Sequence, residues 1–234
     1  MTDLNHYLAR HYVNQIQLAG IAQIGVAELD ELIAARLIPA PSYVVSDDGK
    51  VTSFVFGQLD APGATPGRYF HPAQSVWIAR AREAPTGGAA HQAESILKQR
   101  FTTSFAAALA ALNLSLWRLP DSFDEDGAPI ANGLQARLDS AWTYFLNGTF
   151  NLCVANPISE AHIAYKEVLQ EKLAQQSDNG SRTAFTPQQA RDMHGLIDAY
   201  AAASMRFSPA EYPVSSRKRL VDDLRARLAA ANQD

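Results

Sequence analysis

The sequence predicts a mainly α-helical protein, in which a winged helix-turn-helix-like module with a small β-hairpin precedes an α-helical bundle. Three observations predict this fold class. A helix-turn-helix pattern covers residues 16–43 and places Gly25 at its turn. An Asp-Gly turn at residues 48 and 49 joins two β-rich segments, which is typical of a hairpin. Beyond residue 90 the apolar residues recur at helical spacing almost to the end of the chain.

Length and composition limit the domain organisation. The chain has 234 residues, of which 47% are apolar, so it has enough material for a substantial hydrophobic core. We predict a winged module at residues 1–83, a linker at residues 84–90 and an α-helical domain at residues 91–234. The linker prediction depends on the sequence APTGGAA, which combines proline, glycine and alanine between two regions of different pattern.

The net charge and the number of cysteines indicate which cellular compartment and which binding partners to expect for this protein. The formal net charge of −4 provides no general attraction for nucleic acid or anionic lipid. Cys153 is the single cysteine, so no internal disulfide bond can form and no oxidising compartment is required. The N-terminal residues lack the pattern of a signal peptide, and no apolar run approaches the roughly 18 residues of a membrane span. We therefore expect a cytoplasmic protein of bacterial type with no membrane partner.

Apolar spacing and turn residues predict the elements of the N-terminal module. Helices are expected at residues 3–13, 13–23 and 27–36, the last of which is stopped by prolines 39 and 41. Strands are expected at residues 43–46 and 51–57, and an exposed loop at residues 60–67. Pro72 is expected to be the first residue of a helix that ends near Arg82.

The C-terminal region is predicted to form five helices. They are expected at residues 93–112, from 134 to near 148, 157–172, 186–207 and 216–231. The fourth begins with Thr186, Pro187 and Gln189, which form a capping box with proline at the first helical position. An acidic loop at residues 119–129 and a polar loop at residues 177–184 separate the helices, and together these elements predict a bundle.

The helix-turn-helix pattern resembles the N-terminal part of MerR-type regulators. Leu18-Ala19 matches their first helix, Leu29 matches their second helix, and Leu37-Ile38-Pro39 matches the sequence that ends it. This resemblance covers a short stretch and implies DNA as the partner. A helix-turn-helix can also serve as a module that packs or docks against protein, because fold does not determine function. This alternative stays open beside DNA binding.

Charge argues against DNA binding by this module. A DNA-reading helix needs cations to neutralise phosphates and donors to contact base edges. The second helix of the pattern carries Glu28, Asp30 and Glu31 against a single cation, Arg36. The tip of the predicted hairpin is also acidic. We therefore do not expect this module to bind DNA, and a DNA-binding regulator remains the alternative function.

The sequence contains no strong catalytic motif, and the remaining candidates are His162, His194, Asp198 and Cys153. His162 is expected on the apolar side of its helix, and His194 is expected near Asp198 on the next helix. If the two helices face each other, these residues form a histidine–carboxylate cluster in the bundle core. Neither helix carries the Glu-x-x-His pair that makes such a cluster specific, so no metal is predicted. The alternative is a partly buried, hydrogen-bonded histidine on each helix.

Cys153 and a basic run in the last helix each allow two interpretations. Cys153 lies between two predicted helices, and a nearby helix N-terminus or cation would make its thiol a nucleophile. The alternative is a small residue buried in the core. Arg217-Lys218-Arg219 predicts either a docking surface for an acidic protein partner or a solvated helix face.

Several short segments resemble one bacterial family. They are residues 37–43 (LIPAPSY), 69–72 (YFHP), 142–153 with the string GTFNLC, and 164–167 (AYKE). The chain resembles the domain of unknown function 6058 family over most of its length. Members of that family carry the label of natural-product biosynthesis, which brings no catalytic residue, cofactor or reaction with it.

The resemblance implies a cytoplasmic accessory protein or small enzyme of bacterial natural-product biosynthesis. Its expected partner is a small-molecule or carrier-protein-linked substrate, and its cofactors stay unknown. Two alternatives remain open. One is a DNA-binding regulator of MerR type, and the other is a non-catalytic docking module that binds a protein partner or forms a homodimer.

Overall fold

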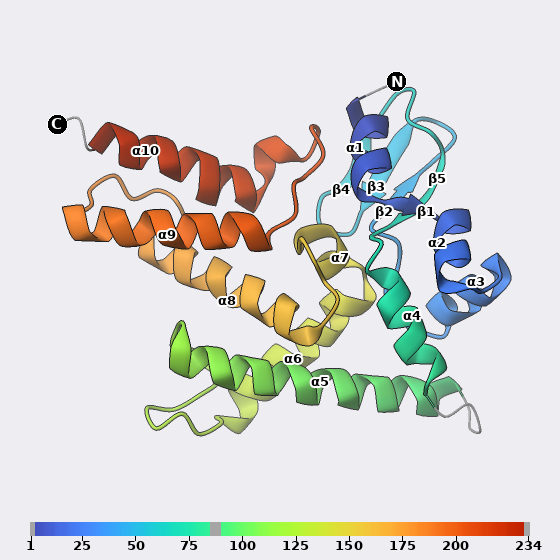
Figure 1. The fold of residues 1–234 in the computed structure, drawn as a ribbon, viewed down its shortest axis with the longest axis horizontal. Helices are drawn as coiled ribbons and strands as arrows, with labels where there is room; N and C mark the ends of the chain where they lie inside the picture. The colour runs from blue at the N-terminus through green and yellow to red at the C-terminus, as the bar shows by residue number, and fades with distance from the viewer. Residues whose placement is uncertain (1–2, 85–89, 232–234) are drawn as a thin grey trace.

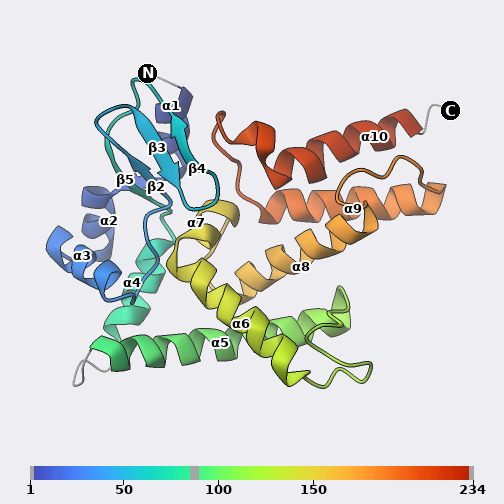
Figure 2. The same ribbon diagram turned by 180° about the vertical axis from the view of Figure 1, so that it is seen from behind.

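The computed structural model describes residues 3–84 and 90–231. The protein is mainly α-helical and has one small antiparallel sheet near its N-terminus (Figure 1). The sheet and the first four helices lie on one side, and the remaining helices lie beside and beneath them (Figure 2). Within the described ranges, no helix combines the length and the apolar character needed to cross a bilayer.

Four helices belong to the N-terminal region. They are α1 (Asp3–His11), α2 (Gln15–Ala22), α3 (Val26–Ala34) and α4 (Gln74–Arg82). The second helix begins at Gln15 rather than at the predicted residue 13. Asn14 accepts a hydrogen bond from the Gln17 amide at 2.9 Å, and the Gln17 side chain accepts one from the Asn14 amide at 2.9 Å. This capping box fixes the helix start, and it leaves residues 13 and 14 free to pair as a strand.

The sheet contains five strands in the order β1-β5-β2-β3-β4, and every pairing is antiparallel. The strands are β1 (Val13–Asn14), β2 (Tyr43–Val45), β3 (Lys50–Ser53), β4 (Gly57–Asp60) and β5 (Gly67–Phe70). The predicted hairpin is confirmed, since Val45 pairs with Val51 across a turn in which Gly49 has φ 76°. A second turn precedes Gly57, the first residue of β4, which has φ 69°. We did not predict β4, because the alternation of apolar residues is too short there.

Within residues 90–231, six α-helices form the C-terminal region. They are α5 (Ala90–Ser115), α6 (Ala131–Leu146), α7 (Thr149–Cys153), α8 (Glu160–Gln176), α9 (Pro187–Ala203) and α10 (Leu224–Ala231). A 3-10 turn (Tyr212–Val214) and a π-helical segment (Lys218–Asp223) precede α10. Helix α8 packs against both α5 and α9, so it forms the centre of this region (Figure 1).

Local capping explains where the helices begin and end. The capping box at Thr186 is confirmed, because Thr186 Oγ1 accepts from the Gln189 amide at 3.2 Å. Helix α8 starts at Glu160 instead of the predicted Pro157, since Ser159 caps it through its side chain. Gly148 adopts a left-handed conformation with φ 81°, which ends α6 and allows the short helix α7 to follow. The position between helices predicted for Cys153 is therefore wrong, because Cys153 is the last residue of α7.

One hydrophobic cluster crosses the predicted linker. Leu18, Leu29 and Trp77 from the N-terminal region pack in the same cluster as Phe101 and Phe145 from α5 and α6. Residues 85–89 of the predicted linker lie outside the described residues. A separate cluster joins side chains of α1 and the sheet to α7 and to the segment after α9. The N-terminal region and the helices are thus held together by shared apolar packing.

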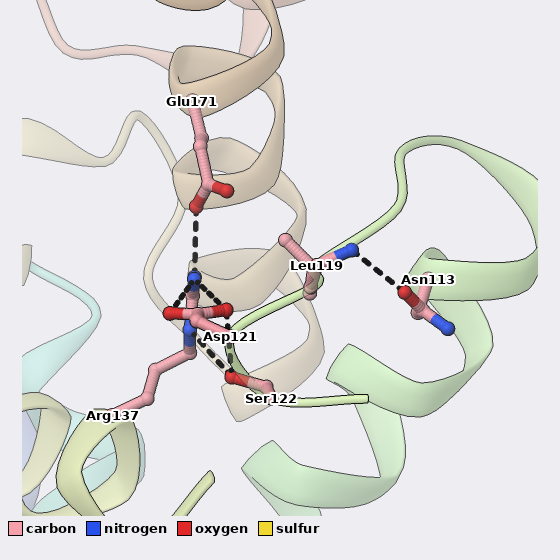
Figure 3. A network of polar contacts seen from close by, with 6 residues as sticks. All are labelled: Asn113, Leu119, Asp121, Ser122, Arg137 and Glu171. Carbon is pink, nitrogen blue, oxygen red and sulfur yellow. Dashed lines mark hydrogen bonds and ion pairs between the residues drawn. The ribbon is translucent and has the colours of Figure 1, made fainter. Parts of the chain in front are cut away.

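A polar network fastens the loop between α5 and α6 (Figure 3). Arg137 on α6 donates to both carboxylate oxygens of Asp121 at 2.9 and 2.8 Å, and to Glu171 on α8 at 2.9 Å. Its Nε donates to Ser122 Oγ at 3.1 Å. Burial disfavours the charged form of Asp121, but the hydrogen bonds and charge of Arg137 outweigh burial and lower the pKa of Asp121. Arg137 therefore links the loop between α5 and α6 to helices α6 and α8, and the carboxylates of Asp121 and Glu171 are both paired with it.

Candidate functional site

An aromatic pocket of about 300 Å³ lies where α4, α5, α6 and the start of α8 meet. Its apolar lining includes Trp77, Phe101, Trp142 and Phe145. Its polar lining is provided by two arginines, two glutamates and one serine. This pocket combines four aromatic side chains with several charged groups, which is a composition typical of a small-molecule site.

Helix α5 contributes one continuous stripe to this pocket. Leu97, Arg100, Phe101 and Ser104 have the spacing i, i+3, i+4 and i+7, so they lie on the same helix face. Leu97 and Phe101 are buried, whereas Arg100 and Ser104 are exposed. The stripe therefore runs from an apolar interior to a polar opening.

The aromatic rings contact one another in fixed geometries. The ring centroid of Phe145 lies 4.7 Å from that of Trp77, with the planes at 72°, and 4.7 Å from that of Phe101. Phe101 and Trp142 have centroids 5.6 Å apart. Edge-to-face and tilted contacts of this kind stabilise aromatic clusters beyond simple burial. The pocket wall is thus a rigid surface made from three different helices.

Arg80 joins α4 to the start of α8. Its guanidinium lies 4.5 Å from the centre of the Trp77 ring and donates to both oxygens of Glu160 at 3.2 and 3.0 Å. The indole Nε1 of Trp77 donates to the carbonyl of Pro157 at 2.7 Å. Glu160 is also in the first turn of α8, where a carboxylate is favoured by the helix dipole. These contacts use the charges of Arg80 and Glu160 to hold the pocket together.

Arg100 differs from Arg80 because it forms no ion pair with any residue in the described part of the chain. It is exposed and lies on the same stripe as Phe101. Glu83, also exposed, contributes an opposite charge to the lining. A guanidinium beside apolar rings is well suited to receive the carboxylate of a ligand.

The structure separates the predicted histidine–carboxylate cluster. His162 and His194 are both exposed, so the prediction that His162 lies on the apolar side of its helix is wrong. The buried residues of α8 include Ile163, Ala164, Val168 and Leu169. His162 is in line with Leu169, seven residues further on, but it lies in the first turn of the helix and its side chain is exposed. The His162 ring instead lies 2.7 Å from Ser159 Oγ at the helix start.

Helix α9 likewise turns its candidate residues outward. His194 and Asp198 are exposed, and Asp198 accepts a hydrogen bond from Arg225 of α10. In the described ranges no three residues of the types His, Cys, Asp and Glu are grouped closely enough to hold a metal ion. The two histidines are therefore not brought together, and Asp198 takes part in a surface ion pair.

Cys153 is buried, and burial raises the pKa of its thiol to about 11. It lines a groove of about 560 Å³ together with Lys166, whose ammonium group donates to Glu167 at 2.8 Å and to Gln170 at 2.6 Å. Burial disfavours the charged form of Lys166, but the charge and hydrogen bond of Glu167, together with the effects of Cys153 and Tyr200, outweigh burial and raise the pKa of Lys166. At neutral pH the thiol keeps its proton and the amine stays charged, so neither is an activated nucleophile.

Sequence reasoning missed a buried carboxyl group, Glu211. It is 1% exposed and accepts hydrogen bonds from Tyr43 at 2.5 Å, Ser53 at 3.0 Å and Ser208 at 2.9 Å. The Ser-x-x-Glu pattern at residues 208–211 is also typical of a helix start. The structure uses the same two residues to connect the sheet to the C-terminal segment, so only the local pattern was visible in the sequence.

Arg100 was also missed as a site residue. Its stripe was visible as the apolar residues 97, 101 and 105, but the positions of α4 and α6 beside it depend on contacts far apart in sequence. The structure places the Trp77 side chain against α5, α6 and the segment just before α8.

Comparison with known proteins provides one match. The model of a family of unknown function, DUF6058, matches residues 97–229, which extend from α5 into α10 and include much of the aromatic pocket. No curated protein and no solved structure matches the chain.

Proposed function

This chain belongs to the family of unknown function DUF6058, and from that premise we propose that it binds a small apolar carboxylic acid in the aromatic pocket. The observation that carries this proposal is Arg100, which lines the pocket together with four aromatic side chains and has no ion-pair partner among the described residues. We propose the setting implied by the sequence resemblance, in which the protein is an accessory protein or small enzyme of bacterial natural-product biosynthesis.

The geometry supports a ligand with an apolar body and an anionic end. The rings of Trp77, Phe101, Trp142 and Phe145 offer an apolar surface, and the exposed end of the α5 stripe offers Arg100 and Ser104. A pocket of about 300 Å³ is at the small end of the range for ligand sites, which favours a compact acid such as an aromatic or branched amino or keto acid. Arg80 is less suitable for this role because Glu160 already neutralises it.

The chemistry of the buried groups favours binding and positioning over covalent catalysis. The Cys153 thiol has its pKa raised to about 11, and Lys166 is held by Glu167 and Gln170. Neither residue lines the aromatic pocket. A substrate carried as a thioester on a carrier protein would lack the free carboxylate, so dependence on Arg100 distinguishes a free acid from a carrier-linked one.

A ligand screen with matched variants tests this proposal. We would screen aromatic amino acids, branched keto acids and fatty acids by thermal shift, then measure the hits by calorimetry. Arg100→Gln should weaken binding of the acid at least about tenfold, because a charge-assisted hydrogen bond is lost. Arg191→Gln, an exposed arginine on α9, is the matched control and should bind normally. Equal affinity in wild type and Arg100→Gln would overturn the carboxylate assignment.

We also propose that α2 and α3 form a helix-turn-helix-like unit that packs against the protein instead of reading DNA. Two of the three carboxylates of α3 are paired within the chain, Glu28 with Arg82 at 3.3 Å and Asp30 with Arg68. Arg36, the cation next to this helix, is paired with Glu94 at 2.9 Å. These ion pairs connect α3 and the residues after it to β5, α4 and α5.

A mobility-shift assay at low salt tests this second proposal. We expect no retardation of duplex DNA, because the groups on α3 present no excess of cations. Binding that weakens steeply with added salt would instead support a MerR-type regulator.

A further inference from the structure

A second pocket, which we call the basic pocket, lies between the segment that follows α9 and the start of the last helix. It has a volume of about 390 Å³ and is lined by Arg206, Phe207, Tyr212, Arg217, Asp222 and Arg225. It shares no lining residue with the aromatic pocket. Three guanidinium groups and one carboxylate line it, although the chain as a whole has a net charge of −4.

Arg217 is fixed in position without a carboxylate partner. Its Nη1 donates to the carbonyl of Ala201 at 2.7 Å, and to the carbonyl and hydroxyl oxygens of Ser204 at 3.0 and 2.9 Å. All three bonds use one nitrogen, so the other guanidinium N–H donors of Arg217, a lining residue of the pocket, make no hydrogen bond to the described residues. Burial and then the positive charge of Arg206 lower the pKa of Arg217, and the charge of Asp222 acts in the opposite direction.

Arg206 adds a second uncompensated charge. Its side chain is exposed and forms no ion pair with the described residues, while its backbone carbonyl accepts a hydrogen bond from Tyr7 at 2.7 Å. The backbone is therefore anchored to α1, and the guanidinium is left free. Arg10 and His11 at the end of α1 contribute to the same field, since burial and then Arg10 and Arg206 lower the pKa of His11.

The nearby carboxylates do not cancel this charge. Asp222 lines the pocket and accepts a hydrogen bond from the Tyr212 hydroxyl at 2.5 Å. Asp198 pairs with Arg225, which removes Arg225 as a free cation. Asp223 lies within 2.7 Å of Lys218 and is paired there. Arg206 and Arg217 remain as two guanidinium groups that form no ion pair with a described carboxylate, and Asp222 offsets part of their charge.

The π-helical segment Lys218–Asp223 contributes to this arrangement. In a regular α-helix, residues eight apart are offset by about 80° around the helix axis. The wider turns of a π-helix contain more residues, which brings Arg217 and Arg225 closer to one face. Interruptions of this type are frequent at functional sites, and here the interruption places both arginines on the same pocket.

We propose that the basic pocket binds the dianion of a phosphate group, with Arg206 and Arg217 as its principal contacts. Planar guanidinium forks match phosphate oxygens, and two neighbouring forks match a doubly charged group better than a single carboxylate. The pocket is larger than a phosphate ion, and Phe207 and Tyr212 provide walls for a small organic group. The ligand class is therefore a small phosphate monoester, and free inorganic phosphate shares the same chemistry.

Calorimetric titration of the full chain tests this site. The titrants are inorganic phosphate and glycerol phosphate, each at an ionic strength matched with sodium chloride. Arg206→Gln is the test variant, because its exposed side chain contributes no internal contact. Arg227→Gln is the matched control, since Arg227 is exposed on α10, outside the pocket, and its replacement changes the net charge equally.

We expect saturable binding of phosphate to the wild type, at least about tenfold weaker binding to Arg206→Gln, and unchanged binding to Arg227→Gln. Tighter binding of glycerol phosphate than of phosphate would identify a monoester as the natural ligand class, and the reverse order would identify the free ion. Absence of saturable binding by both titrants would overturn the proposal. An equal loss in both variants would also overturn it, because that result indicates general charge attraction only.

Discussion

The buried carboxyl group of Glu211 connects the sheet to the segment that follows α9. Three hydroxyl groups, from Tyr43, Ser53 and Ser208, donate to it, and the described residues offer it no ion pair. Two of these donors belong to the sheet and one belongs to the segment after α9. Burial raises the pKa of Glu211, and the three hydrogen bonds offset that effect only in part.

This raised pKa predicts a pH dependence of stability. The folded protein holds the Glu211 proton more tightly than the unfolded chain does, so this group stabilises the fold below the ordinary carboxyl pKa. That contribution is lost as pH rises through the raised pKa. In urea unfolding across this window, Glu211→Gln should flatten the decline in the free energy of unfolding, whereas Glu125→Gln, an exposed control, should not. Identical pH slopes for wild type and Glu211→Gln would contradict the prediction.

The buried thiol of Cys153 predicts low reactivity. With a pKa of about 11 and little exposure, Cys153 should react with a disulfide reagent at pH 8 at least about a hundredfold more slowly in the native protein than in denaturant. The measurement is the rate of thiol labelling followed by absorbance, with the guanidinium-unfolded protein as the control. Rapid stoichiometric labelling of the native protein would restore Cys153 as a nucleophile candidate.

Replacement by alanine should have opposite effects on stability at two glycines that lie within helices. A Cβ at Gly133 of α6 would lie 1.7 Å from the carbonyl oxygen of Asp121, whereas a Cβ at Gly195 of α9 would have no atom within 4 Å. Gly133→Ala should therefore cost about 2 kcal/mol or more through overpacking. Gly195→Ala should stabilise α9 by roughly 0.5–1 kcal/mol, because alanine favours helix. Urea unfolding of both variants checks the signs, and a neutral Gly133→Ala would contradict the close packing of the loop.

Individual elements were predictable where the signal is local. The capping box at Thr186, the Asp-Gly hairpin turn and the long helix α5 were predicted and are confirmed. The pairing of β1 with β5 joins residues 13 and 70 and depends on no local pattern, so it was missed. Ser159 displaced the predicted start of α8 from Pro157, since a side-chain cap outweighed the proline signal.

At the scale of the whole molecule, the aromatic pocket depends on contacts between distant segments. Trp77 bonds to Pro157, and Arg80 bonds to Glu160, across separations that no periodicity in the sequence reports. The same contacts extend one hydrophobic cluster across the predicted linker at residues 84–90. Sequence reasoning therefore predicted the helices that carry the site, and it could not predict that they meet.

The three tryptophans provide the most direct measurement of the central claim, that a small acid binds in the aromatic pocket. Trp77 and Trp142 line this pocket, whereas Trp117 does not. In a nitrogen–proton NMR spectrum, each indole N–H gives its own signal. Titration with an acid identified by the ligand screen should shift the signals of Trp77 and Trp142 in a saturable way and leave that of Trp117 in place. A saturable shift of Trp117 alone, or no shift of Trp77 and Trp142 at saturation, would contradict the account.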